Sequence, residues 1–213
     1  MIKLEKTDVF GWESAIRGMR NPMNSWDMSD SEFSIENNVR EGRFKQSVEI
    51  GENDLKLMKS LSKAGSDHGK FLRFITVTVD ITAPLYWWKE FDTYKVGTVA
   101  NSCSTMHKIH AKEFTIDDFS HEHLLTPAWL EYIINTLNHY RQQYIATKDK
   151  VYWWQMIQLL PSSYNQKRTV QLNYQVLKSM YFARRHHKLD EWREFCAWCE
   201  SLPYFREICI LED

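Results

Sequence analysis

Two polar residues near the C-terminus have a spacing that would suit a bound ligand. Asn173 and Arg184 are eleven residues apart, which is about three helical turns, so a helix would place them on one face roughly 16 Å apart along its axis. A guanidinium can bind a phosphate through two parallel hydrogen bonds. Alternatively, Arg184 belongs to a solvated basic cluster that complements a helix dipole, with Arg185, His186, His187 and Lys188. Both interpretations remain open.

Cysteine and histidine residues also occur in pairs, but these pairs lack the further ligands that a metal site requires. Cys196-Ala-Trp-Cys199 has the spacing of a redox or zinc pair, but its surroundings are helical and lack a second ligand pair, so we predict packed cysteines. His186 and His187 are adjacent, and neighbours on a helix point about 100° apart. His121-x-His123 has no evident third ligand. We therefore expect no metal site, and no catalytic residue is assigned.

Length and charge restrict the classes of function. With 213 residues and 43% hydrophobic content, residues 1–213 are expected to form a single domain around one core. A net charge of -1 gives no basic field for nucleic-acid binding. No apolar run approaches the ~20 residues of a membrane span, and the N-terminus carries charges where a signal peptide would be apolar. With four cysteines in the chain, we expect a cytoplasmic protein that binds neither nucleic acid nor membrane.

Hydrophobic periodicity predicts a helix-rich chain with one clear strand. Residues 74–81 alternate, with Ile75, Val77, Val79 and Ile81 on one side, and Pro84 then ends the strand and starts a helix. Asn53 is expected to cap a helix that stops at Gly65. The other expected elements are an edge strand at 2–10, a loop at 21–47 with a short helix near Ser31–Arg40, and helices at 12–19, 126–147, 151–160, 166–185 and 189–201.

The segment Phe74–His107 joins the strand to Thr82-Ala-Pro84, an aromatic helix with Trp87-Trp88, and a polar loop. This order resembles the flavin-dependent (alternative) thymidylate synthases, whose loop has the pattern Arg-His-Arg-x-x-Ser-x-Asn-x-x-Ser-x-Arg-Tyr. Further stretches similar to family patterns follow in the same order: Ser14–Arg20, Leu57–His68, Leu159–Pro161, Leu172–Leu177 and Ala183-Arg184. The resemblance implies an α+β, helix-rich fold with a central twisted, mostly antiparallel sheet flanked by helices, as in thymidylate synthase-complementing proteins.

The resemblance also implies ligands and site residues. Members of the family are homotetramers that bind FAD at subunit interfaces beside deoxyuridylate, and they use methylenetetrahydrofolate and reduced flavin to make thymidylate. For this chain the resemblance implies FAD, a nucleotide or flavin as small-molecule partner, and a homo-oligomer, with Trp88 and Trp154 expected at its interface. It implies cofactor contacts from His68, Lys70, Arg73, Lys95 and Asn173, and substrate contacts from Asn101, Ser104 and Arg184.

The motif loop nevertheless departs from the family pattern. Without gaps, Arg-His-Arg falls on Thr93, Tyr94 and Lys95, and the first motif serine falls on Thr98. One inserted residue restores Asn101 and Ser104, but Arg-His-Arg then falls on Tyr94, Lys95 and Val96. All three motif arginines are absent in both registers. Three charge-assisted contacts, each worth on the order of 1.5–3 kcal/mol, would be lost, which would weaken deoxyuridylate binding by several orders of magnitude.

Three hypotheses follow. We favour a divergent family member that binds flavin, a pyrimidine nucleotide or both, with chemistry that has diverged from thymidylate synthesis. The first alternative is an active synthase in which other cations replace the motif arginines, with Arg73, Lys95, Arg168 and Arg184 as candidates. The second alternative is a non-catalytic oligomeric scaffold. Whether the protein is an enzyme is therefore left open by the sequence.

Overall fold

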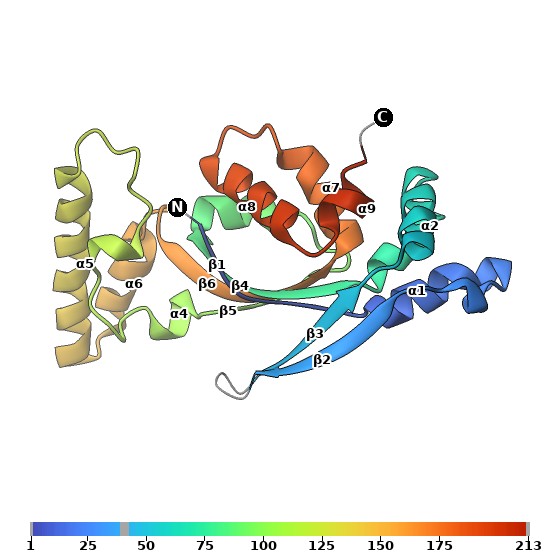
Figure 1. The fold of residues 1–213 in the computed structure, drawn as a ribbon. Coiled ribbons are helices and arrows are strands. Elements are labelled where there is room, and N and C mark those ends of the chain that lie inside the picture. Colours follow the sequence, from blue (N-terminus) through green and yellow to red (C-terminus); the bar gives the residue numbers. More distant parts are fainter. Residues whose placement is uncertain (1, 39–42, 212–213) are drawn as a thin grey trace. The chain divides into compact units, whose positions relative to one another are not determined.

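The larger of two β-sheets has four strands in the computed structural model, which describes residues 2–38 and 43–211 (Figure 1). The strand order is β1 (Lys3–Phe10), β4 (Thr76–Pro84), β6 (Asn165–Asn173) and β5 (Val99–Ser102), so β1 and β5 are the edges. Strand β4 alternates between buried and half-buried side chains, which confirms the predicted period of two. It ends at Pro84 and leads directly into a helix, as the sequence predicted.

Every strand of this sheet crosses from one compact unit of the chain to another. The first unit contains residues 2–3, 81–93 and 101–169, and the second contains residues 4–38, 43–80, 94–100 and 170–211. A single domain over residues 1–213 remains a prediction.

The first unit carries helices α3 (Leu85–Phe91), α4 (Thr105–Lys108), α5 (Ala128–Thr147) and α6 (Lys150–Leu159), with the short η4 (Ile116–Asp118). Helices α5 and α6 pack against each other over a core that includes Leu130, Ile134 and Leu137. These three follow the i, i+4, i+7 spacing of one helix face. Trp129, at the adjacent position, is instead 72% exposed.

The second unit contains a two-stranded hairpin. The predicted loop with a short helix near residues 31–40 was wrong, because β2 (Glu32–Asn38) pairs antiparallel with β3 (Arg43–Glu49). Residue Arg40 lies outside the described residues. Polar composition concealed this hairpin, whose strands are joined by backbone pairing and by a 2.6 Å hydrogen bond between the hydroxyls of Ser34 and Ser47. The remaining elements of this unit are α1 (Trp12–Arg20), η1 (Asn21–Met23), η2 (Trp26–Met28), α2 (Glu52–Lys63), η3 (Gly69–Arg73), α7 (Tyr174–Arg184), α8 (Asp190–Ser201) and α9 (Phe205–Cys209).

The predicted helix over residues 166–185 is half strand and half helix. Residues 165–173 form β6, in which Gln166, Val170 and Leu172 are buried. Helix α7 starts only at Tyr174, after the Asn173 side chain accepts a hydrogen bond from the Val176 amide at 3.1 Å. The sheet neighbours of β6 override the local helical pattern here. Asn173 and Arg184 are consequently the N-cap and the last residue of α7.

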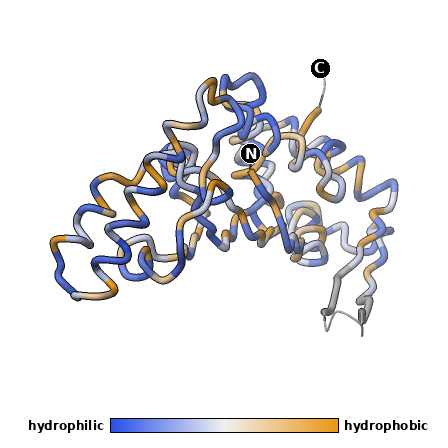
Figure 2. Tube along the Cα trace, turned by 90° about the vertical axis from the view of Figure 1, so that its left-hand side faces the viewer, coloured by the Kyte–Doolittle hydropathy of each residue, from blue (hydrophilic) through white to orange (hydrophobic). Residues whose placement is uncertain are grey.

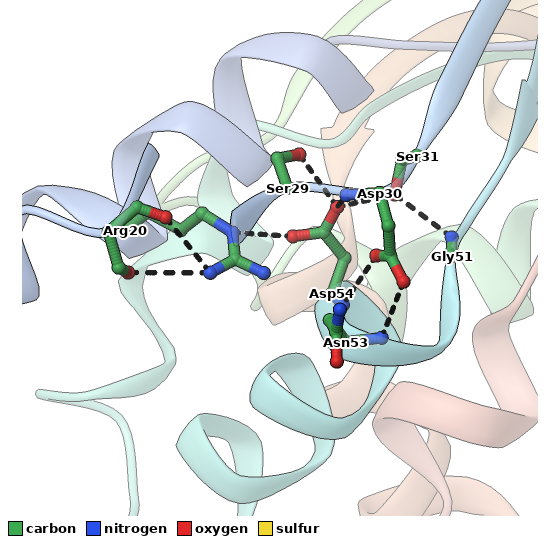
Figure 3. Close-up of polar contacts among 8 residues, drawn as sticks. Arg20, Ser29, Asp30, Ser31, Gly51, Asn53 and Asp54 are labelled. Carbon is green, nitrogen blue, oxygen red and sulfur yellow. Dashed lines mark hydrogen bonds and ion pairs between the residues drawn. The ribbon is translucent and has the colours of Figure 1, made fainter. Parts of the chain in front are cut away.

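A buried ion pair ties α1 to α2 (Figure 3). Arg20 Nε lies 2.7 Å from Asp54 Oδ1, and both side chains are at most 4% exposed. The other carboxylate oxygen of Asp54 accepts hydrogen bonds from Ser29, Ser31 and the Asp30 amide. Asp30 in turn caps α2 by accepting from the Asn53 and Asp54 amides, so the predicted capping role of Asn53 was wrong. This cluster therefore fixes the start of α2 by a contact between distant segments.

Hydrophobic residues are interspersed with hydrophilic ones along the trace (Figure 2). No helix within residues 2–38 and 43–211 combines the length and the apolarity that crossing a membrane requires.

Candidate functional site

Helix α3 supports the first half of the segment that resembles the synthase motif. Its first two amides donate to the carbonyls of Tyr164 and Ser162 at 3.0 Å, which anchors it beside the start of β6. Trp88 donates its indole N–H to the Gln166 carbonyl at 2.9 Å and is 1% exposed. The aromatic helix is thus core, and the expectation of Trp88 at a subunit interface was wrong. Trp154, by contrast, is 44% exposed.

Arg168 on β6 lies against this helix. Its guanidinium carbon is 4.1 Å from the centre of the Trp88 ring, and Nη1 is 2.6 Å from Asp92 Oδ1. Its Nε donates to Gln166 Oε1 at 3.0 Å, and only 14% of the side chain is exposed. Cation–π contact and ion pairing hold this arginine within the first unit. The sequence suggested Arg168 only as a replacement cation and gave no sign of these contacts, which depend on residues up to 80 positions away.

Ser104 lines a cavity of about 250 Å³ in the first unit. Its hydroxyl accepts from the His107 amide at 2.9 Å and caps α4. Two of its lining residues, Lys112 and Asp118, carry opposite charges and form an ion pair with each other. The buried Oδ1 of Asn165 has no hydrogen-bond partner among the described residues. The lining residues are Thr82, Cys103, Ser104, Thr105, Lys112, Asp117, Asp118, Tyr164, Asn165, Gln166 and Lys167. Asn101 is exposed on β5 and is not among them.

Burial and charge both act on Tyr164 in this cavity. Burial raises the pKa of its hydroxyl, and the nearby Asp118 and Cys103 raise it further. The phenol therefore stays protonated at neutral pH and can serve as a hydrogen-bond donor.

Residues 94–100 of the motif loop lie in the second unit, against the N-terminus of α7. Gly97 has a φ of +75°, and a Cβ there would come within 3.1 Å of Asn173 Nδ2 and Val176 Cγ2. Glycine therefore permits both the left-handed backbone and the close approach. Next to it, Thr98 Oγ1 is buried without a hydrogen-bond partner in the described part of the chain. The structure thus brings the loop beside Asn173.

Arg184 lies near the same loop, between two aromatic rings. Its Nε donates to the Tyr94 hydroxyl at 2.9 Å, and its guanidinium carbon is 4.9 Å from the centre of the Trp192 ring and 5.6 Å from that of Tyr94. The interpretation of Arg184 as part of a fully solvated cluster does not hold, because its side chain has a fixed position at the end of α7. This position also restrains it from moving freely onto a ligand.

Four predicted cofactor residues are exposed side chains of the second unit. His68 precedes η3, Lys70 and Arg73 lie within it, and Lys95 lies in the motif loop. Among the described residues, none makes a side-chain hydrogen bond or ion pair with any of these four. Helix η3 packs against α7 through its buried side, and all four side chains belong to the same unit as Asn173 and Arg184. An anionic ligand could therefore recruit them without breaking an internal contact.

The donor set suits a flavin in part. Isoalloxazine carbonyls and ring nitrogens require hydrogen-bond donors, and the Asn173 amide nitrogen and Thr98 hydroxyl could provide them. A pyrophosphate requires cations, and Lys70, Arg73 and Lys95 are exposed. The residues present therefore fit the group, although the planar guanidinium forks of the family motif are missing.

The cysteines behave as packed helical residues. Cys196 and Cys199 are free and buried in α8, as predicted.

Within the described ranges, no three His, Cys, Asp or Glu side chains are grouped as metal ligands. His121, which the sequence offered as a potential metal ligand, has its Nδ1 atom 2.8 Å from the Phe119 carbonyl oxygen.

Comparison with known proteins adds information on the fold. A crystal structure of thymidylate synthase X (ThyX) from Helicobacter pylori with FAD and dUMP matches 98% of this chain and 97% of its own, with a TM-score of 0.71 and 12% sequence identity. A second Helicobacter pylori structure, of flavin-dependent thymidylate synthase ThyX complexed with FAD and dUMP, matches with a TM-score of 0.69, 12% identity, and 96% and 98% coverage. This chain has the ThyX fold. No protein-family model matches the sequence, and no curated protein matches it.

The match to ThyX confirms the predicted fold class, which is helix-rich α+β with a mostly antiparallel central sheet. It extends over nearly the whole of both chains. At 12% identity the likeness concerns the fold, and the ligand contacts of individual residues stay predictions.

Proposed function

We propose that this protein is a divergent relative of the flavin-dependent thymidylate synthases that binds FAD or a pyrimidine nucleotide and has lost thymidylate synthesis. The observation that carries the proposal is the ThyX fold combined with the altered motif loop. The matching structures hold FAD and dUMP, whereas the loop at residues 93–107 has no arginine. FAD is the proposed cofactor, with contacts from His68, Lys70, Arg73, Lys95 and Asn173.

Internal contacts of two arginines support the loss of the original reaction. Arg168 is held by Trp88 and Asp92, and Arg184 is held by Tyr94 and Trp192. The guanidinium groups of both arginines are thus already engaged within the protein. Moreover, the family stretch Val-Asn-x-Arg-x-Leu places an arginine where this chain has Gln175. Arg73 and Lys95 are therefore the candidate replacements for the motif arginines. The nucleotide contacts that we propose are those of Asn101, Ser104 and Arg184, whose Nη groups could bind a phosphate while Nε stays on Tyr94.

Titration with FAD tests the proposal directly. After FAD is added back and unbound FAD is removed by desalting, the purified protein should keep the visible flavin absorption band, and Arg73→Ala and Lys95→Ala should weaken the binding. Lys56→Ala is the matched control, because Lys56 is an exposed cation on α2 of the same unit. Absence of FAD binding by the folded wild-type protein would instead favour the scaffold alternative.

Deoxyuridylate separates the divergent protein from an active synthase. A ligand that binds only the folded state raises the thermal midpoint, so dUMP at millimolar concentration can be tested by thermal unfolding. Product analysis with dUMP, methylenetetrahydrofolate and reduced FAD then asks whether dTMP forms. We expect no dTMP, and its formation at a rate proportional to protein concentration would establish the active-synthase alternative.

We also propose that the protein self-associates through the outer surface of α5 and α6, and that it is a cytoplasmic homotetramer. This surface exposes Leu125 completely, Trp129 by 72% and Tyr132 by 69%. Large aromatic side chains of this kind expose roughly 150–250 Å² each when uncovered, and contiguous apolar surface commonly marks an interface. Light scattering should show a smaller assembly for Trp129→Glu, whereas Gln142→Glu on the same helix should leave the mass unchanged.

A further inference from the structure

A second cavity, of about 440 Å³, lies in the second unit and contains none of the predicted site residues. Its volume is within the range of about 300–1,000 Å³ that small-molecule sites occupy. Strands β1 and β3, the start of α1, the end of α8 and the residues after α8 contribute to it; these elements are labelled in Figure 1. The lining residues are Thr7, Asp8, Val9, Phe10, Trp12, Ser47, Val48, Trp198, Ser201, Leu202 and Pro203.

The walls of this cavity are mainly apolar and aromatic. Phe10 is 39% exposed, while Trp12 is 1% exposed and belongs to the core. Trp198 has a fixed position, because its indole N–H donates to the Thr7 hydroxyl at 3.1 Å. Aromatic faces attract cations, with indole the strongest of them. The cavity therefore offers apolar contact together with a preference for positive charge.

The polar lining groups are occupied internally, with one exception. The hydroxyl of Ser47 is paired with that of Ser34 at 2.6 Å, and the hydroxyl of Ser201 donates to the Trp198 carbonyl at 2.7 Å. Asp8 is the one charged residue in the described lining, and it has no hydrogen bond or ion pair within residues 2–38 and 43–211. The nearest cation along β1, Lys6, lies 3.9 Å from Asp80 instead. The charged group that is left to interact with a ligand at this cavity is therefore the negative carboxylate of Asp8.

We propose that this cavity binds a small organic cation, an ammonium group attached to an aromatic or aliphatic body. Asp8 supplies the counter-charge, and the rings of Phe10 and Trp198 cover the apolar body. Phosphates and carboxylates are disfavoured, since no cation among the described residues lines the cavity to offset their repulsion by Asp8. The proposal is independent of flavin binding, because the two sets of residues do not overlap.

Three probes of similar shape and different charge test it. The indole N–H resonance of Trp198, assigned with Trp198→Phe, is followed by NMR during titration with 2-phenylethylammonium, neutral 2-phenylethanol or anionic 3-phenylpropanoate. We expect saturable shifts with the cation, binding about tenfold weaker with the alcohol, and none with the anion, since a hydrogen bond to a charged group is worth on the order of one tenfold step or more. Equal responses to cation and alcohol would overturn the proposal.

Variants of the protein distinguish the contribution of the Asp8 charge from that of the shape of the cavity. Asp8→Asn should weaken 2-phenylethylammonium about tenfold and leave 2-phenylethanol unchanged, whereas Asp67→Asn, an exposed carboxylate of the same unit, should change neither. Ser47→Phe should fill the cavity and abolish both, which gives a second test if Asp8→Asn is poorly folded. A Trp198 resonance that shifts with protein concentration alone would show that a second copy occupies the cavity, and would also overturn the proposal.

Discussion

Arg184 donates a hydrogen bond from Nε to the hydroxyl of Tyr94 at 2.9 Å. Tyr94 falls on the Arg-His-Arg part of the family motif in both possible registers. A loop position expected to bring a basic side chain to the ligand instead brings a phenol that holds an existing arginine.

Removal of the Tyr94 hydroxyl should reveal whether this contact is structural. Tyr94→Phe is expected to lower the free energy of unfolding by about 1 kcal/mol, because Arg184 loses an acceptor in a half-buried position. Urea denaturation measures the change, and Tyr132→Phe, at a position that is 69% exposed, serves as the control. An unchanged urea midpoint for Tyr94→Phe would show that the hydrogen bond adds nothing to stability.

Gly97 and Gly65 form a matched pair for testing the approach of the motif loop to α7. Both have positive φ values, +75° and +100°, but a Cβ at Gly65 would meet nothing within 4 Å. Gly65→Ala should cost about 1 kcal/mol from backbone strain. Gly97→Ala should cost more, because its methyl group also meets Asn173 and Val176 at 3.1 Å, and it should weaken FAD binding. Equal losses in unfolding free energy would argue against a close approach.

The buried Asp54 should make stability depend on pH in the acid range. Burial raises the pKa of its carboxyl, but hydrogen bonds from Ser31, Ser29 and Arg20 outweigh this effect and leave the pKa below the ordinary value of 3.8. A lowered folded-state pKa stabilises the protein above pH 3.8, and this contribution is lost as the pH falls through the folded-state value. Unfolding free energies measured by urea titration between neutral pH and acid should show the decline.

Asp54→Asn should remove this dependence. The variant leaves Arg20 buried without its counter-charge, so we expect a loss of about 3–5 kcal/mol at neutral pH and a flatter decline in acid. Asp67→Asn, exposed in the same unit, should match the wild type in both respects. A neutral-pH stability of Asp54→Asn within error of the wild type would contradict the assigned role.

Cysteine alkylation should be selective for Cys103. Burial raises the pKa of Cys196 to about 11, with a further contribution from Glu200. Burial also raises the pKa of Cys209 to about 12, despite the opposing charge of Lys178. Because the thiolate is the nucleophile, iodoacetamide at neutral pH should label the exposed Cys103 first. Mass spectrometry of digests checks this, and in Cys103→Ser the fast phase should disappear.

Local patterns were sufficient for elements whose periodicity comes from burial on one side. The alternation at residues 74–81 and the proline that follows predicted β4 and α3, since a strand with one face buried and the other partly exposed must alternate apolar and polar side chains with a period of two. The absence of the motif arginines is likewise a property of the sequence alone. It follows from the residue types at positions 93–107, because no fold can give a guanidinium to a position that has none.

Only the tertiary structure decided how the remaining residues are used. Residues 32–38 and 43–49 became strands because they supply each other's backbone partners, and residues 165–173 because distant segments supply theirs. Single-sequence periodicity contains no information on such partners. For the same reason, the sequence could not show that Arg168 stacks on Trp88 or that Arg184 is held by Tyr94. The sequence determined which cations are missing, and the tertiary structure determined which of the remaining ones already have partners.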